Sequence, residues 1–306
     1  MVGGNQSLRE IIMRVFVTGA TGFIGQIVVE DLLSAGHQVL GLARSDAAAA
    51  QLTARGVEVR RGELSDPQSL AAGAAEADGV IHTAFIHDFS RFAENIEIDR
   101  LATEAMLDAL AGSGKPFVGS SGTAMLQVSG RPATEQDATM AASRGATETL
   151  TLAAADRGVR SSVVRLAPSV HDVERQGLVS QLGQIARATG VSAYVGEGAN
   201  RWPAVHRLDA ARLFRLALED ARPGTRLHAV AEEGIPLKTI AEAVGQSVGV
   251  PTRSLTPEEA GAQFGWLGMF VMADTPASST ITQQTFGWRP SHAGLLAGIR
   301  EGGYRL

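Results

Sequence analysis

Three glycines, Gly19, Gly22 and Gly25, stand at spacings suited to holding a diphosphate. They lie in TGATGFIG, directly after a run of strand-forming residues and directly before the apolar helical pattern FIGQIVVEDLLSAG. Glycine permits a tight turn and close approach of the backbone to a diphosphate, and a helix N-terminus attracts the anion. We therefore predict that this stretch binds a dinucleotide through the following residues: Thr18, Gly19, Thr21, Gly22, Phe23, Ile24 and Gly25.

The end of the second predicted strand, GLARSD, indicates which dinucleotide binds. In such sites an acidic residue here bonds the ribose 2′-hydroxyl of NAD, whereas an arginine accommodates the 2′-phosphate of NADP. Arg44 and Ser45 occupy the strand end, and Asp46 already lies beyond it. We predict that NADP (NADPH) is the cofactor; the alternative is that Arg44 is a solvated side chain without a ligand.

The first half of the chain must position these residues on an alternation of strands and helices. Apolar runs at 14–18, 38–43, 57–61, 79–83, 116–120 and 160–166 predict strands. Helical patterns fall near 23–35, 46–55, 67–76, 91–112 and 138–157. The alternation favours a parallel sheet with helices on both faces, whose strands read as continuous Val, Ile and Leu runs. We predict an α/β fold built on a doubly wound parallel Rossmann sheet.

After Pro168 the regular pattern is interrupted by Gly, Pro and polar residues, which predicts a smaller, irregular C-terminal substrate lobe. The 306 residues are enough for a large and a small unit that share a cleft. We expect a flexible N-terminal leader at 1–12 and an NADP-binding Rossmann domain at 13–170, to which a segment near 205–230 returns. The remaining residues, 171–204 and 231–306, are assigned to the small substrate-binding lobe.

With Thr18 before its glycines, TGATGFIG resembles the extended branch of the short-chain dehydrogenase/reductase superfamily, the NAD-dependent epimerase/dehydratase-like proteins. Later segments are similar to that family in the same order: GELSD at 62–66, VIHTAF at 80–85, VVRLAPSVH at 163–171, VHRLDAARLFRLALE at 205–219 and TFGWRP at 285–290. The resemblance implies that 62–66 lies beside the adenine, 80–85 along the cofactor and 163–171 beside the nicotinamide. It adds these cofactor contacts: Glu63, Leu64, Thr83, Ala84, Phe85, Pro168, Ser169 and Val170.

The proton donor of that family, a tyrosine followed four residues later by a lysine, is absent. The resemblance aligns MAASRGATE with the family's helix and places Met140 at the tyrosine position and Arg144 at the lysine position. Neither Tyr194 nor Tyr304 is followed by a lysine at that spacing, so the pair is not found elsewhere. Because residues i and i+4 share a helix face, we expect Arg144 to contact the cofactor in the catalytic cleft and Met140 to line the substrate pocket.

Other side chains could supply the proton that reduction of a carbonyl needs. Ser121 and Thr123 flank the third position of the family's catalytic set; their alternative role is to bond the loop backbone. His87, with Asp88 beside it, and His171 are imidazole candidates, for which a structural role is the alternative. Two further possibilities stay open: the acceptor needs no proton, as with an iminium, or the protein does not turn over.

Aromatic residues gather in FGWLGMF, near the C-terminal end of the chain. They favour an apolar wall for the substrate, with packing inside the small lobe as the alternative. Such a wall disfavours a sugar nucleotide, because recognition of a diphosphate calls for basic residues in the cleft. The residues expected to contact the substrate are Met140, His87, Tyr194 and Trp266.

The composition of the chain limits the kinds of partner that it can bind. A net charge of −5 argues against nucleic acid, since binding to phosphate backbones needs a surplus of clustered basic residues. With no cysteine and no H-E-x-x-H, we expect no metal site. The chain has no apolar run long enough for a membrane span and its first residues resemble no secretion signal, so we expect a cytoplasmic protein. The resemblance implies a homodimer formed through helices 91–112 and 138–157.

These features favour one function over two alternatives. We expect an NADP-dependent oxidoreductase that transfers hydride to or from a small, moderately apolar carbonyl, imine or activated alkene without the usual tyrosine. The first alternative is a non-catalytic NADP-binding redox sensor. The second is a sugar-nucleotide epimerase or dehydratase, which is disfavoured because those reactions rely on the missing tyrosine.

Overall fold

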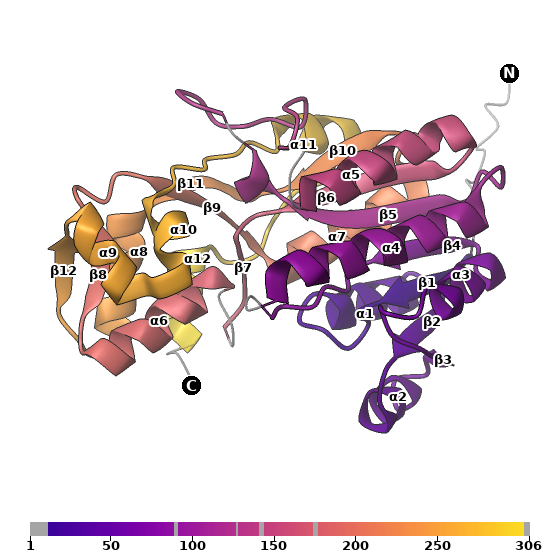
Figure 1. Ribbon diagram of the computed structural model, residues 1–306, viewed down its shortest axis with the longest axis horizontal. Helices are drawn as coiled ribbons and strands as arrows, with labels where there is room; N and C mark the ends of the chain where they lie inside the picture. The colour runs from indigo at the N-terminus through magenta and orange to yellow at the C-terminus, as the bar shows by residue number, and fades with distance from the viewer. Residues whose placement is uncertain (1–11, 89–90, 127, 141–143, 174–176, 303–306) are drawn as a thin grey trace, which may run out of the picture.

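A seven-stranded parallel sheet forms the centre of the molecule, in the order β10-β6-β5-β4-β1-β2-β3 (Figure 1). The computed structural model describes residues 12–88, 91–126, 128–140, 144–173 and 177–302. The strands are β1 (Arg14–Thr18), β2 (Gln38–Ala43), β3 (Glu58–Arg61), β4 (Gly79–His82), β5 (Pro116–Gly122), β6 (Arg160–Leu166) and β10 (Thr225–Ala229). The strand order reverses between β1 and β4, and ligands bind at the carboxyl ends of the strands at such a point.

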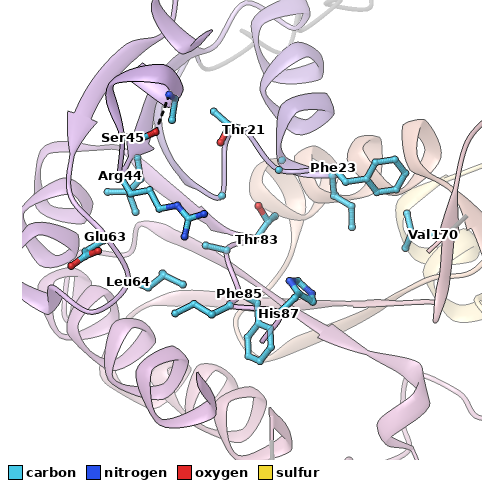
Figure 2. Close-up of a pocket in the computed structure, with 18 of the residues that line it drawn as sticks. Thr21, Phe23, Arg44, Ser45, Glu63, Leu64, Thr83, Phe85, His87 and Val170 are labelled. Atoms are coloured by element: carbon cyan, nitrogen blue, oxygen red, sulfur yellow. Dashed lines mark hydrogen bonds between the residues drawn. The ribbon is translucent and has the colours of Figure 1, made fainter. Parts of the chain in front are cut away.

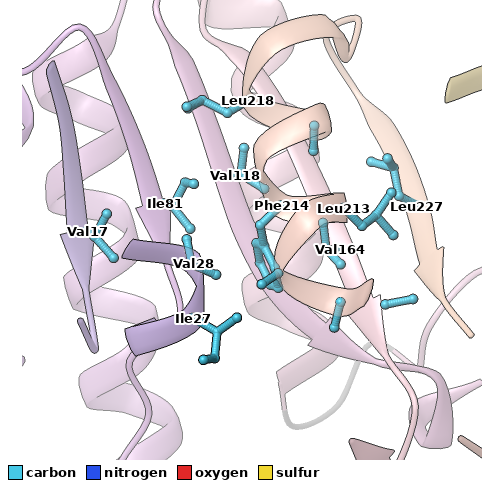
Figure 3. Packing of buried hydrophobic residues seen from close by; sticks show 14 of the residues in the cluster. Val17, Ile27, Val28, Ile81, Val118, Val164, Leu213, Phe214, Leu218 and Leu227 are labelled. Carbon is cyan, nitrogen blue, oxygen red and sulfur yellow. The ribbon is translucent and has the colours of Figure 1, made fainter. Parts of the chain in front are cut away.

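Helices cover both faces of this sheet, so the predicted doubly wound α/β fold is confirmed. Helices α1 (Gly25–Ser34) and α7 (Arg207–Asp220) pack together on one face; α3 (Pro67–Glu76), α4 (Phe92–Leu110) and α5 (Arg144–Ala153) cover the other. The shorter α2 (Asp46–Thr53) follows β2 at the edge. Two buried clusters result, one around Val17, Val28 and Phe214 (Figure 3) and one around Phe16 and Phe117. Neighbouring residues of β1 alternate between the clusters, as the pleat requires.

The second half of the chain builds a smaller lobe with its own buried cluster, which includes Trp202, Leu237 and Phe264. Its strands are β7 (Ser169–His171), β9 (Arg201–His206) and β11 (Glu232–Pro236) in one sheet, and β8 (Ser192–Val195) and β12 (Thr252–Leu255) in another. Its helices are α6 (Leu178–Thr189), α8 (Leu237–Val248), α9 (Pro257–Phe264), α10 (Gly268–Met272) and α12 (Leu295–Gly302), whereas α11 (Thr280–Phe286) packs against β10 of the large sheet (Figure 1). Segment 207–229 returns to the large sheet as α7 and β10.

The predicted strands appear within two residues of their expected ends, but the predicted helix near 138–157 starts too early, because 138–140 are not helical. Helix α5 is described from Arg144 to Ala153, and the 3-10 turn η3 (Ala154–Arg157) continues it to the predicted end. Met140 lies in front of the helix, where its N–H donates to the Met125 carbonyl at 3.4 Å. Met140 and Arg144 therefore do not share a helix face. Residues 1–11, Ser143 and Tyr304 lie outside the described residues.

The lobes share a boundary at the loop after β6. Pro168 and Val170 follow that strand, and β7 crosses from there to pair with β9 in parallel. The segment therefore reaches both the edge of the large sheet and the small lobe. None of the helices in the described part of the chain is long and apolar enough to cross a membrane.

Candidate functional site

One cavity of about 1010 Å³ lies at the carboxyl ends of β1, β2 and β4 and reaches the small lobe. This volume is at the upper end of the range for ligand pockets. Figure 2 shows side chains from β2, the β4 loop and the lobe boundary around the same space. The predicted cofactor residues that line it are Gly19, Thr21, Gly22, Phe23, Ile24, Gly25, Arg44, Ser45, Glu63, Leu64, Thr83, Ala84, Phe85, Pro168 and Val170.

The glycine loop fits the close approach of a diphosphate. Gly19 has a φ of 70°, and a Cβ added there would lie 2.8 Å from the Ala84 nitrogen. A Cβ on Gly25 would lie 2.0 Å from the Gly19 carbonyl oxygen, so only glycine allows the helix to start against the turn. Helix α1 also begins without a side-chain cap. The N–H groups of Gln26, Ile27 and Val28 donate to the carbonyls of Gly22 and Ile24, so the anion would meet the start of the helix at Gly25, which lines the cavity, and the positive end of the helix dipole.

The end of β2 presents a positive charge to the cavity. In Figure 2 the guanidinium of Arg44 extends from the strand end into the cavity. Ser45 caps α2, because its Oγ accepts from the Ala48 N–H at 3.2 Å. The nearby Asp46 is engaged elsewhere, with 2.9 Å between its Oδ1 and Arg61 Nη2. This side of the cavity thus carries the Arg44 guanidinium, which can bond a phosphate, together with the carboxylate of Glu63.

Thr18 does not line the cavity; it supports the glycine loop from behind. Its buried hydroxyl lies 2.6 Å from His82 Nδ1, and its carbonyl accepts from Thr83 Oγ1 at 2.8 Å. The other ring nitrogen of His82 lies 3.3 Å from Asp99 Oδ1. Burial raises the pKa of Asp99, but the His82 hydrogen bond and the charges of His82 and Arg144 outweigh it, so the pKa is lowered overall.

Arg144 does not line the cavity either. Its guanidinium Cζ lies 4.2 Å from the centroid of the Phe85 ring, and Phe85 lines the cavity. The Nη2 atom of Arg144 donates to the Ser120 carbonyl at 3.2 Å, and its Nε lies 3.8 Å from Asp99 Oδ2. Burial lowers the pKa of Arg144, and the charge of Asp99 opposes this change. The side chain expected to touch the ribose is thus packed behind Phe85.

His87 lines the cavity beside Phe85. The two rings meet edge to face, with 5.2 Å between their centroids, and Figure 2 shows them adjacent at the cavity wall. Among the described lining residues it is the one imidazole. His87 is therefore the predicted proton donor that the fold brings to the cavity.

Ser121 and Thr123 are turned to structural partners outside the cavity. Ser121 Oγ donates to Glu148 Oε2 at 2.6 Å, and Glu148 forms a buried ion pair with Arg165, with 2.6 Å between Oε1 and Nη2. Thr123 Oγ1 donates to the Leu166 carbonyl at 3.4 Å and is 1% exposed. The alternative of a bond to the backbone therefore describes Thr123, with the carbonyl at the end of β6 as its partner, whereas Ser121 bonds to a buried side chain.

His171 and Ser169 are buried in β7 and do not reach the cavity. The His171 ring packs edge to face on His206, with 5.5 Å between centroids. Burial, together with His206, lowers the pKa of His171 to about 4. The imidazole is therefore neutral at physiological pH and is a poor proton donor from this position.

Of the remaining predicted substrate residues, only Trp266 lines the cavity. It lies in the 3-10 turn η4 (Gly265–Leu267), edge-on to Phe270 at 6.0 Å between centroids. Met140 is 38% exposed in front of α5. Tyr194 sits on β8 in the small lobe, where Lys238 Nζ lies 5.8 Å from its ring centroid. Neither residue lines the cavity.

Several lining residues were missed by sequence reasoning. Those on α2 line the same cavity as Arg44, so the helix that follows the strand end was an available signal. Those at the start of α6 carried no local signal, because only the folding of the small lobe brings them to the cavity. The missed residues are Leu42, Ala47, Ala48, Gln51, Gly62, Ser65, Ile86, Gly177, Leu178 and Gln181.

No group of three His, Asp or Glu side chains in the described ranges is arranged to hold a metal ion. The histidines nearest to one another, His171, His206 and His292, stack or pack edge to face instead. The chemistry of the site therefore depends on the cavity and on its lining side chains.

Comparison with known proteins gives a consistent picture. The model of the NAD dependent epimerase/dehydratase family matches residues 15–230. An uncharacterized protein of Saccharomyces cerevisiae is 47% identical over 293 residues, 94% of this chain and 98% of that protein. The 2-alkyl-3-oxoalkanoate reductase of Stenotrophomonas maltophilia is 29% identical over 78% of this chain and 77% of the reductase. The dTDP-glucose 4,6-dehydratase DesIV of Streptomyces venezuelae, solved with NAD and TYD, superposes with a TM-score of 0.75 at 20% identity, covering 94% of this chain and 96% of DesIV.

Proposed function

Because the chain belongs to the NAD dependent epimerase/dehydratase family, whose members are NAD(P)-dependent enzymes, we propose that it is an NADP-dependent oxidoreductase. Its substrate is a small, moderately apolar carbonyl, imine or activated alkene. The observation that carries the proposal is the cavity of about 1010 Å³, which joins the glycine loop and Arg44 to the apolar edge of the small lobe. Bound there, NADPH supplies the hydride, and the chain orients it against the acceptor.

The positive charge of Arg44 supports the preference for NADP. Arg44 lines the cavity at the strand end, and Asp46, the acid two residues later, is paired with Arg61. A guanidinium forms strong, charge-assisted hydrogen bonds to phosphate oxygens, which a 2′-hydroxyl cannot match. The 2′-phosphate is thus held by Arg44 beside the capped start of α2.

The proton is supplied by His87. Its imidazole lines the cavity next to Phe85, on the loop that follows β4. Ser121 and Thr123 are engaged with Glu148 and the Leu166 carbonyl, and Met140 has no proton to give. A positioned general acid typically contributes about 10²–10⁴-fold, so an imidazole in place of the phenol sustains reduction. An acceptor such as an iminium would not need even this proton.

The substrate is apolar and carries no diphosphate. Among the described residues that line the cavity, Arg44 is the one arginine or lysine, and it stands at the end of β2, away from the lobe side. The lobe side is lined by Leu178, Gln181 and Trp266, which can pack on an alkyl chain but cannot neutralise a diphosphate. The similarity to a 2-alkyl-3-oxoalkanoate reductase supports a reductase more than an epimerase. In this proposal 13–170 and 205–230 bind NADP, and 171–204 and 231–306 bind the substrate.

A second candidate is a non-catalytic NADP-binding redox sensor. The engagement of Ser121 by Glu148 and the packing of Arg144 behind Phe85 favour it, because both side chains are withdrawn from the cavity. In either case we propose a homodimer through α4 and α5, in the cytoplasm. Leu101 on α4 is 40% exposed and is an apolar residue that a partner could cover.

A binding and turnover assay separates the two candidates. NADPH and NADH are titrated by fluorescence, and oxidation of NADPH is then followed with ketones, 3-oxo acids, imines and enones of increasing alkyl chain length. Tight NADPH binding with turnover that improves with chain length supports the reductase. NADPH binding without oxidation by any acceptor supports the sensor, and failure to bind either dinucleotide rejects both.

A further inference from the structure

Arg144 has a role that its position in the sequence does not suggest. We propose that Arg144 and its counter-ion Asp99 are positioning residues, which fix the ring of Phe85 and, through it, the imidazole of His87 at the cavity wall. The inference deepens the proposed function, because it rests on His87 as the proton donor. It replaces direct contact between Arg144 and the cofactor ribose with action through an aromatic ring.

The first support is the burial of Asp99 opposite Arg144. Asp99 is 1% exposed, and its Oδ1 is taken by His82 Nε2 at 3.3 Å. Its Oδ2 is buried, as is Arg144 Nε, and neither atom has a hydrogen-bond partner in the described part of the chain. The two atoms lie 3.8 Å apart, which is close enough for an ion pair. A buried carboxylate needs a compensating charge, so Asp99 holds the guanidinium where it is.

The second support is the way Phe85 is enclosed. The Arg144 guanidinium lies over its ring at 4.2 Å, a favourable cation–π arrangement. The rings of His87 and Phe92 pack edge to face around it, at centroid distances of 5.2 and 6.3 Å. Such packing selects one orientation of the Phe85 ring. The imidazole that packs against this ring is thereby oriented too.

The Asp99 carboxylate is also linked, through two further contacts, to the start of the glycine loop. Asp99 contacts His82, and His82 contacts Thr18, which precedes the glycine loop. Loss of Asp99 would therefore remove the contact with His82 as well as the anchor of Arg144, whereas a change of Arg144 leaves the contact between Asp99 and His82 in place. This difference makes Arg144 the cleaner residue to change.

The test uses the full-length protein and needs no turnover. His87 is one of seven histidines, so its imidazole signal in the spectrum of protein labelled at histidine Cε1 is assigned by its absence in His87→Gln. Arg144→Met, Arg144→Lys and the control Arg157→Met, which loses an exposed pair with Asp108, are compared with the unchanged protein. The affinity of each for NADPH is measured by fluorescence.

We expect Arg144→Met to shift or broaden the His87 signal while NADPH affinity stays within about twofold, a change of roughly 0.4 kcal/mol. Arg144→Lys keeps the cation over Phe85 and should restore the signal, and Arg157→Met should leave it unchanged. If Arg144→Met weakens NADPH binding tenfold or more and leaves the His87 signal unmoved, Arg144 contacts the cofactor and the inference is wrong.

A second variant covers the case in which Arg144→Met does not fold. Phe85→Leu keeps every charge and removes the ring that links Arg144 to His87. It should shift the His87 signal, and an unmoved signal overturns the inference; NADPH affinity is not a readout for this variant, because Phe85 itself lines the cavity. A protein that binds NADPH but reduces nothing contradicts the proposed function alone, since both readouts are made without turnover.

Discussion

Asp46 and Arg61 form an ion pair, with 2.9 Å between Oδ1 and Nη2, beside the strand end from which Arg44 enters the cavity. Arg61 is the last residue of β3, and Asp46 opens α2. The pair neutralises the acid that lies two residues after Arg44. Glu63 also lines the cavity, and Arg44 is the one arginine or lysine among the described lining residues.

Replacing Arg44 should therefore change the cofactor preference. A hydrogen bond to a charged group contributes about 1.5–3 kcal/mol, so Arg44→Ala should weaken NADPH binding by roughly 10–100-fold. NADH binding should stay the same, because NADH lacks the 2′-phosphate. Fluorescence titration of both dinucleotides measures the ratio.

Arg61→Ala is the matched control for Arg44→Ala. Its pair with Asp46 is exposed, and such pairs contribute about 0–1 kcal/mol, so its effect on NADPH affinity should be several-fold at most. An equal loss for NADPH and NADH in Arg44→Ala would reject the assignment of NADP.

Removal of the His87 imidazole should affect the proton step and spare cofactor binding. His87→Gln should lower kcat by about 10²–10⁴-fold, the usual contribution of a general acid. The pH profile of kcat should also lose the limb on which the rate falls with rising pH. The measurement is steady-state turnover across pH, together with NADPH affinity as the control.

Two results would speak against this role of His87. A variant with unchanged kcat points to an acceptor that needs no proton. A variant whose NADPH affinity falls in step with kcat indicates that His87 holds the cofactor rather than donating.

The buried network around Glu148 should matter for stability. Glu148→Gln leaves Arg165 without its counter-ion, and breaking a buried ion pair typically costs about 3–5 kcal/mol in the free energy of unfolding. Ser121→Ala should cost less, about 1–3 kcal/mol, because Glu148 keeps Arg165. Urea denaturation measures both.

Asp108→Asn is the control for these variants. It breaks the exposed pair with Arg157, so its effect should not exceed about 1 kcal/mol. If Ser121→Ala instead abolished turnover without destabilising the protein, Ser121 would leave Glu148 during the reaction and belong to the catalytic set.

His171 should make stability depend on pH. Burial, assisted by His206, lowers the pKa of His171 from 6.5 to about 4 in the folded protein, so the unfolded chain binds the extra proton first. The free energy of unfolding therefore keeps its full value above about pH 6.5. It falls as the pH drops from there toward 4, by up to about 1.4 kcal/mol per pH unit.

The pH effect is checked with His171→Gln. Its free energy of unfolding, measured in urea from pH 7 to 4, should fall less steeply with acidification than that of the unchanged protein. Some dependence should remain, because burial also lowers the pKa values of His206 and His228. Parallel curves for the two proteins would show that His171 does not titrate in this range.

Much of the fold could be predicted because its signals are local. The strand at 14–18, the glycines that follow it and the helix after them are consecutive in the chain, and Arg44 directly follows a strand. The cavity collects fifteen of the predicted cofactor residues for this reason. The start of the helix near 140 was misplaced, because contacts with a distant segment hold 139–140 out of the helix: Thr139 forms an antiparallel bridge with Leu126, and the Met140 N–H donates to the Met125 carbonyl.

By itself the sequence determined the class of fold, the glycine loop, the arginine at the end of β2 and the absence of a Tyr-x-x-x-Lys pair. Only the tertiary structure decided which candidates reach the cavity. Glu148 engages Ser121 across 27 positions, and Asp99 holds Arg144 behind Phe85. The physical reason is that a buried polar or charged side chain must find a partner, and that partner is chosen by how distant segments pack.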